Sequence, residues 1–398
     1  MAIIPRRSAL PIALMTAALP LSAAMAGDDS TVSVRDLYDG KLMPDEQVEA
    51  YRNIDALFPS RTVRASSTPH AFGEREVDIE GFTFTDDDTT YDLYDFMSLN
   101  RVSGLIVVHD NDIVFEQYAL GNDRDTRWMS MSVVKSIAST LIGAAIEDGH
   151  IGSLDDNVVE YVPELAGSGY DGATVEHILL MASGVAWDET YDDPDSDRRE
   201  MLERQIAQES GAIVQQLAEL ERVAAPGEVW NYSTGETQLL AAIIEGAVGT
   251  SVSDYLSDTL WASYGMEHDA AWWLDGEDGQ EIGGSGLLAT LRDYARFGQF
   301  FLDEGQANDG ERILPEGWVE VAGRGHDIGG EPIAYGYSWW PVGDEGAFAA
   351  VGIFGQWVFI HPDKNIVIAM SGAQPKSLGF EIVPVSRFFH ALADAITE

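Results

Sequence analysis

Strand-like patterns lie towards both ends of the chain, and helical patterns fill its middle. Two apolar runs, 105–108 and 113–115, flank the polar segment 109–112, which is the signature of a β-hairpin. Near the C-terminus, two further apolar runs at 357–360 and 366–369 are joined by a short polar connection. These two pairs predict one sheet that is built from both ends of the chain.

Helical periodicity dominates the stretch from about 150 to 275. Apolar residues recur there at spacings of three and four, for example over 213–223 and 237–248. Further helices are predicted over 290–302, which opens with a capping-box-like spacing, and over 383–396. The expected fold class is therefore α+β, with an antiparallel sheet formed by the N- and C-terminal segments, flanked by helices, and an inserted, mostly helical region.

The first 26 residues have the pattern of a secretion signal. Two arginines precede an apolar run from Ala9 to Ala24, and the small residues that end at Ala26 fit a cleavage site. We therefore expect cleavage after Ala26 and a periplasmic or secreted mature protein. The chain has no cysteine for lipid attachment, and no later apolar run is long enough to span a bilayer, so no stable membrane anchor is expected.

Composition divides the rest of the chain into two parts. Residues 27–85 are mostly polar, with one short helical pattern at 45–57, and are predicted to be an N-terminal extension. Residues 86–398 are predicted to form the main domain, with the helical subregion inside it. Within that domain, the segment 188–197 is unusually dense in aspartate and glutamate.

The charge of the chain argues against two classes of partner. It has 67 acidic and 23 basic residues, for a formal net charge of −44 at pH 7. Such a surface repels phosphate backbones and anionic lipids, so binding to nucleic acid or to a membrane surface is not expected. Adaptation to high salt is one interpretation of this excess, because dissolved ions screen the self-repulsion.

The most informative short motif is Ser132-Val133-Val134-Lys135, which stands at the start of an apolar helical pattern. Residues three apart share a helix face, so Lys135 can hydrogen-bond the hydroxyl of Ser132. A buried lysine has a lowered pKa and can take the proton whose loss makes a serine nucleophilic. A capped helix with an incidental lysine would give the same four residues, so other motifs must decide the function.

Two other segments could complete such a site. Tyr232 lies just before a predicted helix, and a nearby lysine cation would favour its phenolate for proton transfer. The strand 350–356 carries Gly352 and Gly355, which would let the backbone approach a substrate closely enough to form an oxyanion hole. A lone tyrosine is more often part of a core, so each segment is weak evidence by itself.

In this order the motifs resemble those of the serine β-lactamase and penicillin-recognising superfamily. More narrowly, the chain is similar to the class C-like serine hydrolases, and within them to the 6-aminohexanoate-dimer hydrolases and related esterases. The resemblance runs from about residue 53 to the C-terminus, and it includes 128–136, 177–184, 283–287 and 335–340.

The resemblance implies a β-lactamase/transpeptidase-like fold and a role for each motif. Ser132 would form the acyl-enzyme, and Lys135 and Tyr232 would share the duties of general base and general acid. The backbone N–H groups of Ser132 and Ile353 would form the oxyanion hole, with Gly352 close to the substrate.

The resemblance also implies contacts with the substrate. A tyrosine on a mobile loop that covers the substrate has its counterpart in Tyr191, although a solvated loop explains the acidic segment 188–197 equally well. Trp339 would either line the pocket or belong to the core. Ala350 stands where relatives carry a basic residue that commonly holds the β-lactam carboxylate, which argues against penicillin hydrolysis.

We therefore expect an exported serine hydrolase that cleaves small amides or esters and uses no cofactor or metal. The alternatives are a D,D-peptidase, a D-amino-acid amidase, a β-lactamase, or a non-catalytic binding module of the same fold. The sequence contains neither Gly-x-Ser-x-Gly, the motif of α/β-hydrolases, nor His-Glu-x-x-His, the motif of zinc proteases, so neither of these enzyme classes is indicated. The expected partner is a small-molecule substrate, and the oligomeric state is not predicted.

Overall fold

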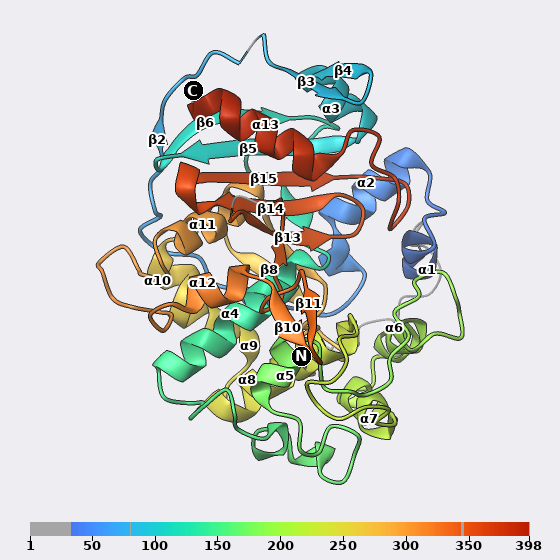
Figure 1. The fold of residues 1–398 in the computed structure, drawn as a ribbon. Helices are drawn as coiled ribbons and strands as arrows, with labels where there is room; N and C mark the ends of the chain where they lie inside the picture. Colours follow the sequence, from blue (N-terminus) through green and yellow to red (C-terminus); the bar gives the residue numbers. More distant parts are fainter. Residues whose placement is uncertain (1–32, 80, 344–345, 398) are drawn as a thin grey trace, which may run out of the picture.

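The computed structural model describes residues 33–79, 81–343 and 346–397. The predicted secretion signal and its cleavage site lie outside the described residues. A seven-stranded sheet forms one part of the molecule, with helices on both of its faces, and a largely helical region lies beside it (Figure 1). This arrangement confirms the α+β fold that the sequence predicts.

The seven-stranded sheet joins segments from both ends of the chain. β5 (Val102–His109) pairs with β15 (Ile366–Gly372) in antiparallel register, with Leu105 opposite Met370. Both predicted hairpins are present, as β5–β6 and β14–β15. All neighbours are antiparallel except β2 and β6. The strand order is β12 (Trp340–Pro341), β13 (Phe348–Gly352), β14 (Gln356–His361), β15, β5, β6 (Asp112–Tyr118) and β2 (Gly73–Glu74).

Side chains alternate between the two faces of this sheet, and each face buries its own core. On one face, α13 (Val385–Thr397) and α3 (Leu93–Leu99) pack against the strands, and the rings of Phe96 and Phe388 stack with centroids 3.8 Å apart. On the other face, α11 (Leu291–Leu302) and α4 (Val133–Glu147) cover the sheet. Helix α4 is buried along almost its whole length, so its N-terminus is held rigidly.

Along the chain, the helical region lies mostly between α4 and α11. Helix α8 (Thr234–Val248) begins before the predicted periodic stretch because the hydroxyl of Ser233 caps it, accepting a hydrogen bond from the N–H of Glu236. Further helices and helical turns after residue 150 are α5 (Val175–Leu179), α6 (Asp197–Ala207), α7 (Ala212–Glu219), α9 (Val252–Leu256), α10 (Ala262–Tyr264), α12 (Trp318–Gly323), η2 (Val158–Glu160), η3 (Pro163–Leu165), η4 (Ser257–Trp261) and η5 (Pro362–Lys364).

Three smaller sheets complete the described part of the chain. A four-stranded sheet has the order β1 (Ser60–Val63), β8 (Ala270–Trp273), β9 (Leu287–Thr290) and β7 (Arg127–Met129). Two hairpins are formed by β3 (Thr83–Asp86) with β4 (Thr89–Asp92), and by β10 (His326–Ile328) with β11 (Glu331–Ile333). No described helix is by itself long and apolar enough to cross a membrane, and α8 with the segment 252–264 passes that test only as a pair bent by 78°.

The predicted N-terminal extension is packed into the main domain. Helices α1 (Val34–Tyr38) and α2 (Pro44–Arg52) and the turn η1 (Ile54–Ala56) bury apolar residues in the same core as α4. Strand β1 pairs with β8, more than 200 residues further along the chain. The described structure therefore has no break between two packed units at residue 85.

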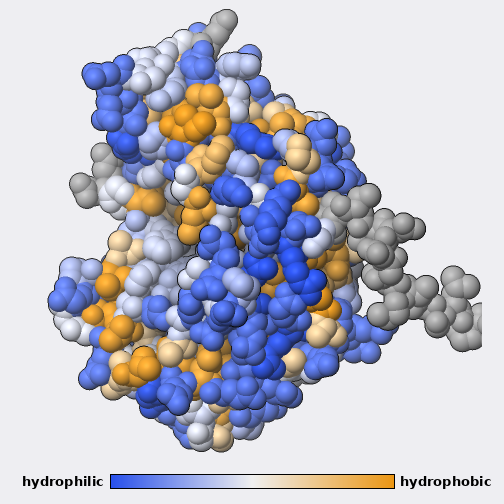
Figure 2. Space-filling model, turned by 90° about the vertical axis from the view of Figure 1, so that its right-hand side faces the viewer, coloured by the Kyte–Doolittle hydropathy of each residue, from blue (hydrophilic) through white to orange (hydrophobic). Residues whose placement is uncertain are grey.

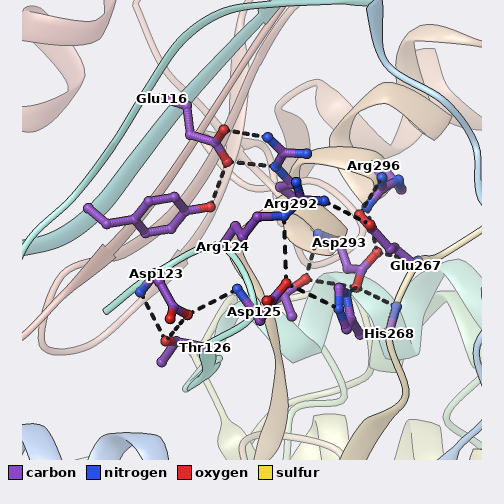
Figure 3. A network of polar contacts seen from close by, with 12 residues as sticks. Glu116, Asp123, Arg124, Asp125, Thr126, Glu267, His268, Arg292, Asp293 and Arg296 are labelled. Carbon is purple, nitrogen blue, oxygen red and sulfur yellow. Dashed lines mark hydrogen bonds and ion pairs between the residues drawn. The ribbon is translucent and has the colours of Figure 1, made fainter. Parts of the chain in front are cut away.

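Charged side chains around α11 make many polar contacts, which Figure 3 draws together as a network. The side chain of Asp293 is fully buried, pairs with Arg296 at 2.9 Å and accepts a hydrogen bond from the backbone N–H of Glu267. Arg292 of the same helix holds Glu116 of β6 in a bidentate pair. The network fixes α11 against the sheet and against the turn that leads through β7 to Ser132. The surface on the side of α1 and α6 is largely hydrophilic (Figure 2), in keeping with the charge of the chain.

Candidate active site

Ser132 stands at the junction of a strand and the buried helix α4. β7 ends at Met129, and Met131 adopts a left-handed backbone with φ of +42°, which turns the chain sharply into α4. Ser132 is the N-terminal capping residue of α4, but its hydroxyl makes no capping hydrogen bond with the helix. The side chain is therefore not used as a cap, and the positive end of the helix dipole lies directly behind it.

A cleft of about 1220 Å³ opens in front of Ser132. Four of the other predicted site residues line the same cleft as Ser132, namely Tyr191, Tyr232, Gly352 and Ile353. The cleft is somewhat larger than most small-molecule sites, which usually measure between about 300 and 1,000 Å³, so it has room for a small organic substrate.

Lys135 is buried beneath Ser132, with 2% of its surface exposed. Its Nζ lies 2.9 Å from Thr234 Oγ1, 3.1 Å from Thr237 Oγ1 and 3.1 Å from the carbonyl oxygen of Gly284. The predicted hydrogen bond to the Ser132 hydroxyl is not among these contacts. Burial lowers the pKa of Lys135 to about 7, although the nearby charge of Glu189 acts in the opposite direction. A large fraction of the amine is therefore neutral at neutral pH and can accept a proton.

Tyr232 lies close to Lys135 and lines the same cleft as Ser132. Lys135 Nζ lies 5.6 Å from the centre of the tyrosine ring. Burial and the charge of Glu189 raise the pKa of Tyr232 well above its usual value, so the phenol is protonated. This is opposite to the phenolate that the sequence suggested, because burial and the negative charge of Glu189 both favour the neutral phenol.

Gly352 brings the end of β13 against the backbone of the nucleophile. A Cβ atom at this position would lie 2.6 Å from the carbonyl oxygen of Ser130 and 3.0 Å from the amide nitrogen of Ser132, so no side chain fits. Ile353 follows directly, at the start of the turn into β14. The backbones of Ser132 and Ile353 thus share one wall of the cleft, where an oxyanion hole would have to lie.

The prediction for Trp339 as a pocket residue is wrong. Trp339 has no exposed surface, and its ring packs against Phe301 and Phe348 in the core. Trp340 lines the cleft instead, with its ring centre 5.7 Å from that of Tyr232. Neighbouring residues of an extended segment point to opposite sides, so a choice between two adjacent tryptophans depends on a register that the sequence does not define.

Several residues of the site were missed by sequence reasoning. Glu189 accepts hydrogen bonds from both the backbone N–H and the hydroxyl of Thr234, at 2.8 and 2.5 Å. Tyr38, from the predicted extension, lines the cleft and lies under the guanidinium of the buried Arg198, 4.8 Å from its ring centre. Thr234 follows Tyr232 by two positions, and this closeness in sequence was the one local feature that could have marked Thr234 as a site residue. Among the described residues, no cluster of three or more metal-binding side chains is present.

The chain is similar to several known proteins. Residues 100–382 match the protein family described as Beta-lactamase. Over 307 residues the chain is 32% identical to the 6-aminohexanoate-dimer hydrolase of Paenarthrobacter ureafaciens, a match that covers 73% of this chain and 76% of that protein. A solved structure from Bacillus anthracis, designated a candidate 6-aminohexanoate-dimer hydrolase, has a TM-score of 0.72 at 25% identity and covers 87% of this chain and 92% of that one. A class C β-lactamase shares the fold, with a TM-score of 0.55 at 18% identity over 76% of this chain and 92% of that one.

Proposed function

Because the chain belongs to the serine β-lactamase family and is therefore a hydrolase, we propose that it cleaves small amides or esters through an acyl-Ser132 intermediate. The observation that carries this proposal is the position of Ser132 and Tyr232 on the wall of one cleft, above the buried amine of Lys135. We also propose that the protein is exported and loses its first 26 residues. N-terminal sequencing of the secreted protein tests that part.

In the proposed acylation step, the neutral amine of Lys135 is the ultimate base. Ser132 Oγ attacks the carbonyl carbon of the substrate, and its proton passes through the hydroxyl of Tyr232 to Lys135. The backbone N–H groups of Ser132 and Ile353 stabilise the negative charge that develops on the carbonyl oxygen. Tyr232 returns the proton to the leaving amine or alcohol as the bond to it breaks. Water then attacks the acyl-enzyme by the same route and releases the acid.

The charges around the cleft favour a substrate that is neutral or carries an amine. The acidic residues that line the cleft are Asp39, Asp188, Glu189, Asp192 and Glu381. Lys376 is the one lysine in that lining, and its Nζ contacts the carbonyl oxygen of Gly40 at 3.0 Å. Ala350, in the slot where relatives carry a basic residue, is fully buried. A substrate carboxylate would meet like charges here, whereas an ammonium group, as in an ω-amino-acyl amide, would be attracted.

We expect short-chain esters and ω-amino-acyl amides to be hydrolysed at least about tenfold faster, in kcat/KM, than penicillins or cephalosporins. The preference for amine-bearing over neutral substrates should shrink as salt rises, because ions screen the carboxylates at the cleft mouth. The measurement is kcat/KM at low and at molar salt for p-nitrophenyl acetate and butyrate, aminohexanoate oligomers, nitrocefin and D-Ala-D-Ala peptides.

Three of the alternative functions would each give a different result with this panel. A kcat/KM for nitrocefin above that for the p-nitrophenyl esters would make the protein a β-lactamase. Preferential cleavage of the D-Ala-D-Ala peptides would make it a D,D-peptidase. Binding of the substrates without turnover or acylation would favour a non-catalytic module.

A further inference from the structure

The carboxylate of Glu189 is bound to the start of the helix that carries the partners of Lys135. It lies on the loop between α5 and α6 and accepts three hydrogen bonds, from the indole N–H of Trp187 and from the backbone N–H and hydroxyl of Thr234. Thr234 is the first residue of α8, so the carboxylate also lies at the positive end of that helix.

These bonds determine which way the protons around Lys135 point. A threonine hydroxyl has one proton, and that of Thr234 is donated to Glu189, so towards Lys135 Nζ the hydroxyl can only accept. The hydroxyl of Thr237 donates to the carbonyl oxygen of Thr234, so it too can only accept from Lys135. The third partner, the carbonyl oxygen of Gly284, has no proton to donate. Three acceptors around one nitrogen match an ammonium group with its three N–H donors.

Two opposing influences therefore act on the same amine. Burial favours the neutral form of Lys135, and the chain of hydrogen bonds that starts at Glu189 favours the charged form. Three other charged or titratable side chains lie around these hydrogen bonds, namely Arg198 of α6, Tyr191 of the loop and Tyr232 before α8. Arg198 makes no ion pair within the described residues, and its charge opposes that of Glu189 on Lys135.

We propose that Glu189 is a positioning residue that sets the protonation state of Lys135 through the hydroxyl of Thr234. This inference rests on the proposed role of Lys135 as the base of the hydrolase. Glu189 does not touch the reacting atoms in this proposal. It orients the Thr234 proton away from the amine and supplies the negative charge that keeps the ammonium form accessible between turnovers.

The test is the pH dependence of kcat/KM for p-nitrophenyl butyrate between about pH 5 and 10. The acid limb reports Lys135. The alkaline limb of Tyr232 lies above this range, because burial and the charge of Glu189 raise the pKa of that phenol well above its usual value. In Glu189→Gln the acid limb should move to lower pH by about one unit, because loss of the negative charge destabilises the ammonium form of Lys135. Well below the acid limb, the variant should then be about tenfold more active relative to its own maximum than the wild type is.

Variants of Thr234 separate the hydrogen bond from the charge. Thr234→Val removes the hydrogen bond to Lys135 but keeps the charge of Glu189, so the acid limb should move to lower pH. Thr234→Ser keeps the hydroxyl, so its acid limb should stay at the wild-type position. Asp195→Asn is the matched control, because Asp195 lies on the same acidic loop, is exposed and is outside the cleft lining, so its acid limb should match that of the wild type.

A purely structural role for Glu189 would lower kcat/KM equally at every pH, and an unmoved acid limb in Glu189→Gln would overturn the proposal. If Glu189→Gln does not fold, as judged by its thermal melt, an unmoved acid limb in folded Thr234→Val overturns it instead. Failure of the proposed function gives a different result, namely no acyl adduct on the wild-type protein at any pH.

Discussion

Replacing Ser132 with alanine is expected to abolish covalent labelling by a fluorophosphonate or a slow ester. The hydroxyl makes no capping bond to α4, so its removal should leave the helix and the cleft intact. The oxyanion hole and the binding surface would remain, and residual catalysis on the order of 10³-fold over water is possible, as in other serine hydrolases. The measurement is the intact mass of the protein after incubation with the reagent, together with a thermal melt.

Ser377 offers a matched control for this experiment. It is a second serine whose side chain lines the same cleft, but it has no lysine three residues after it. Ser377→Ala should be labelled as completely as the wild type. An adduct of unchanged yield on Ser132→Ala would remove Ser132 from its role as nucleophile.

Lys135→Ala and Tyr232→Phe should each lower kcat by about 10²- to 10⁴-fold, and the double variant should lose little more. Both groups handle the same proton, so removal of either one breaks the relay completely. Lys135→Met is the useful companion variant, because it fills the buried space that alanine leaves empty. Rates of acylation in single turnovers give the comparison.

Losses that multiply in the double variant would show that the two groups act independently, which contradicts a shared relay. A thermal melt of each protein separates lost chemistry from lost folding, since Lys135 also satisfies two threonine hydroxyls and a carbonyl group in the core. Tyr232→Phe keeps the ring contacts with Tyr335 and Trp340, so its fold should be unaffected.

The parts of this molecule that sequence reasoning predicted well depend on local patterns. Short apolar runs found the strands within 102–118 and 356–372, and helical spacing found the helix that follows Ser132, because each such pattern is complete within about twenty residues. The pairing of Ser132 with Lys135 on one helix was visible for the same reason.

What the sequence did not reveal depends on contacts between distant segments. The three partners of the Lys135 amine lie 99, 102 and 149 residues away, and no spacing rule connects them. Glu189 was hidden in a run of acidic residues, where only the structure separates one functional carboxylate from its solvated neighbours. β1 was missed because its four residues carry little apolar pattern and are paired only through β8.

The pairing of β5 with β15 also constrains when the protein can fold. The two strands at the centre of the large sheet lie about 260 residues apart in the chain, with Val108 opposite Val367. During synthesis the β5–β6 hairpin emerges long before β15 exists, so one edge of β5 stays unpaired while the helical segments between them are made. Closing so long a loop is slow compared with local helix formation. The sheet is therefore expected to be the last part to assemble, and the waiting hairpin edge is the segment most exposed to aggregation.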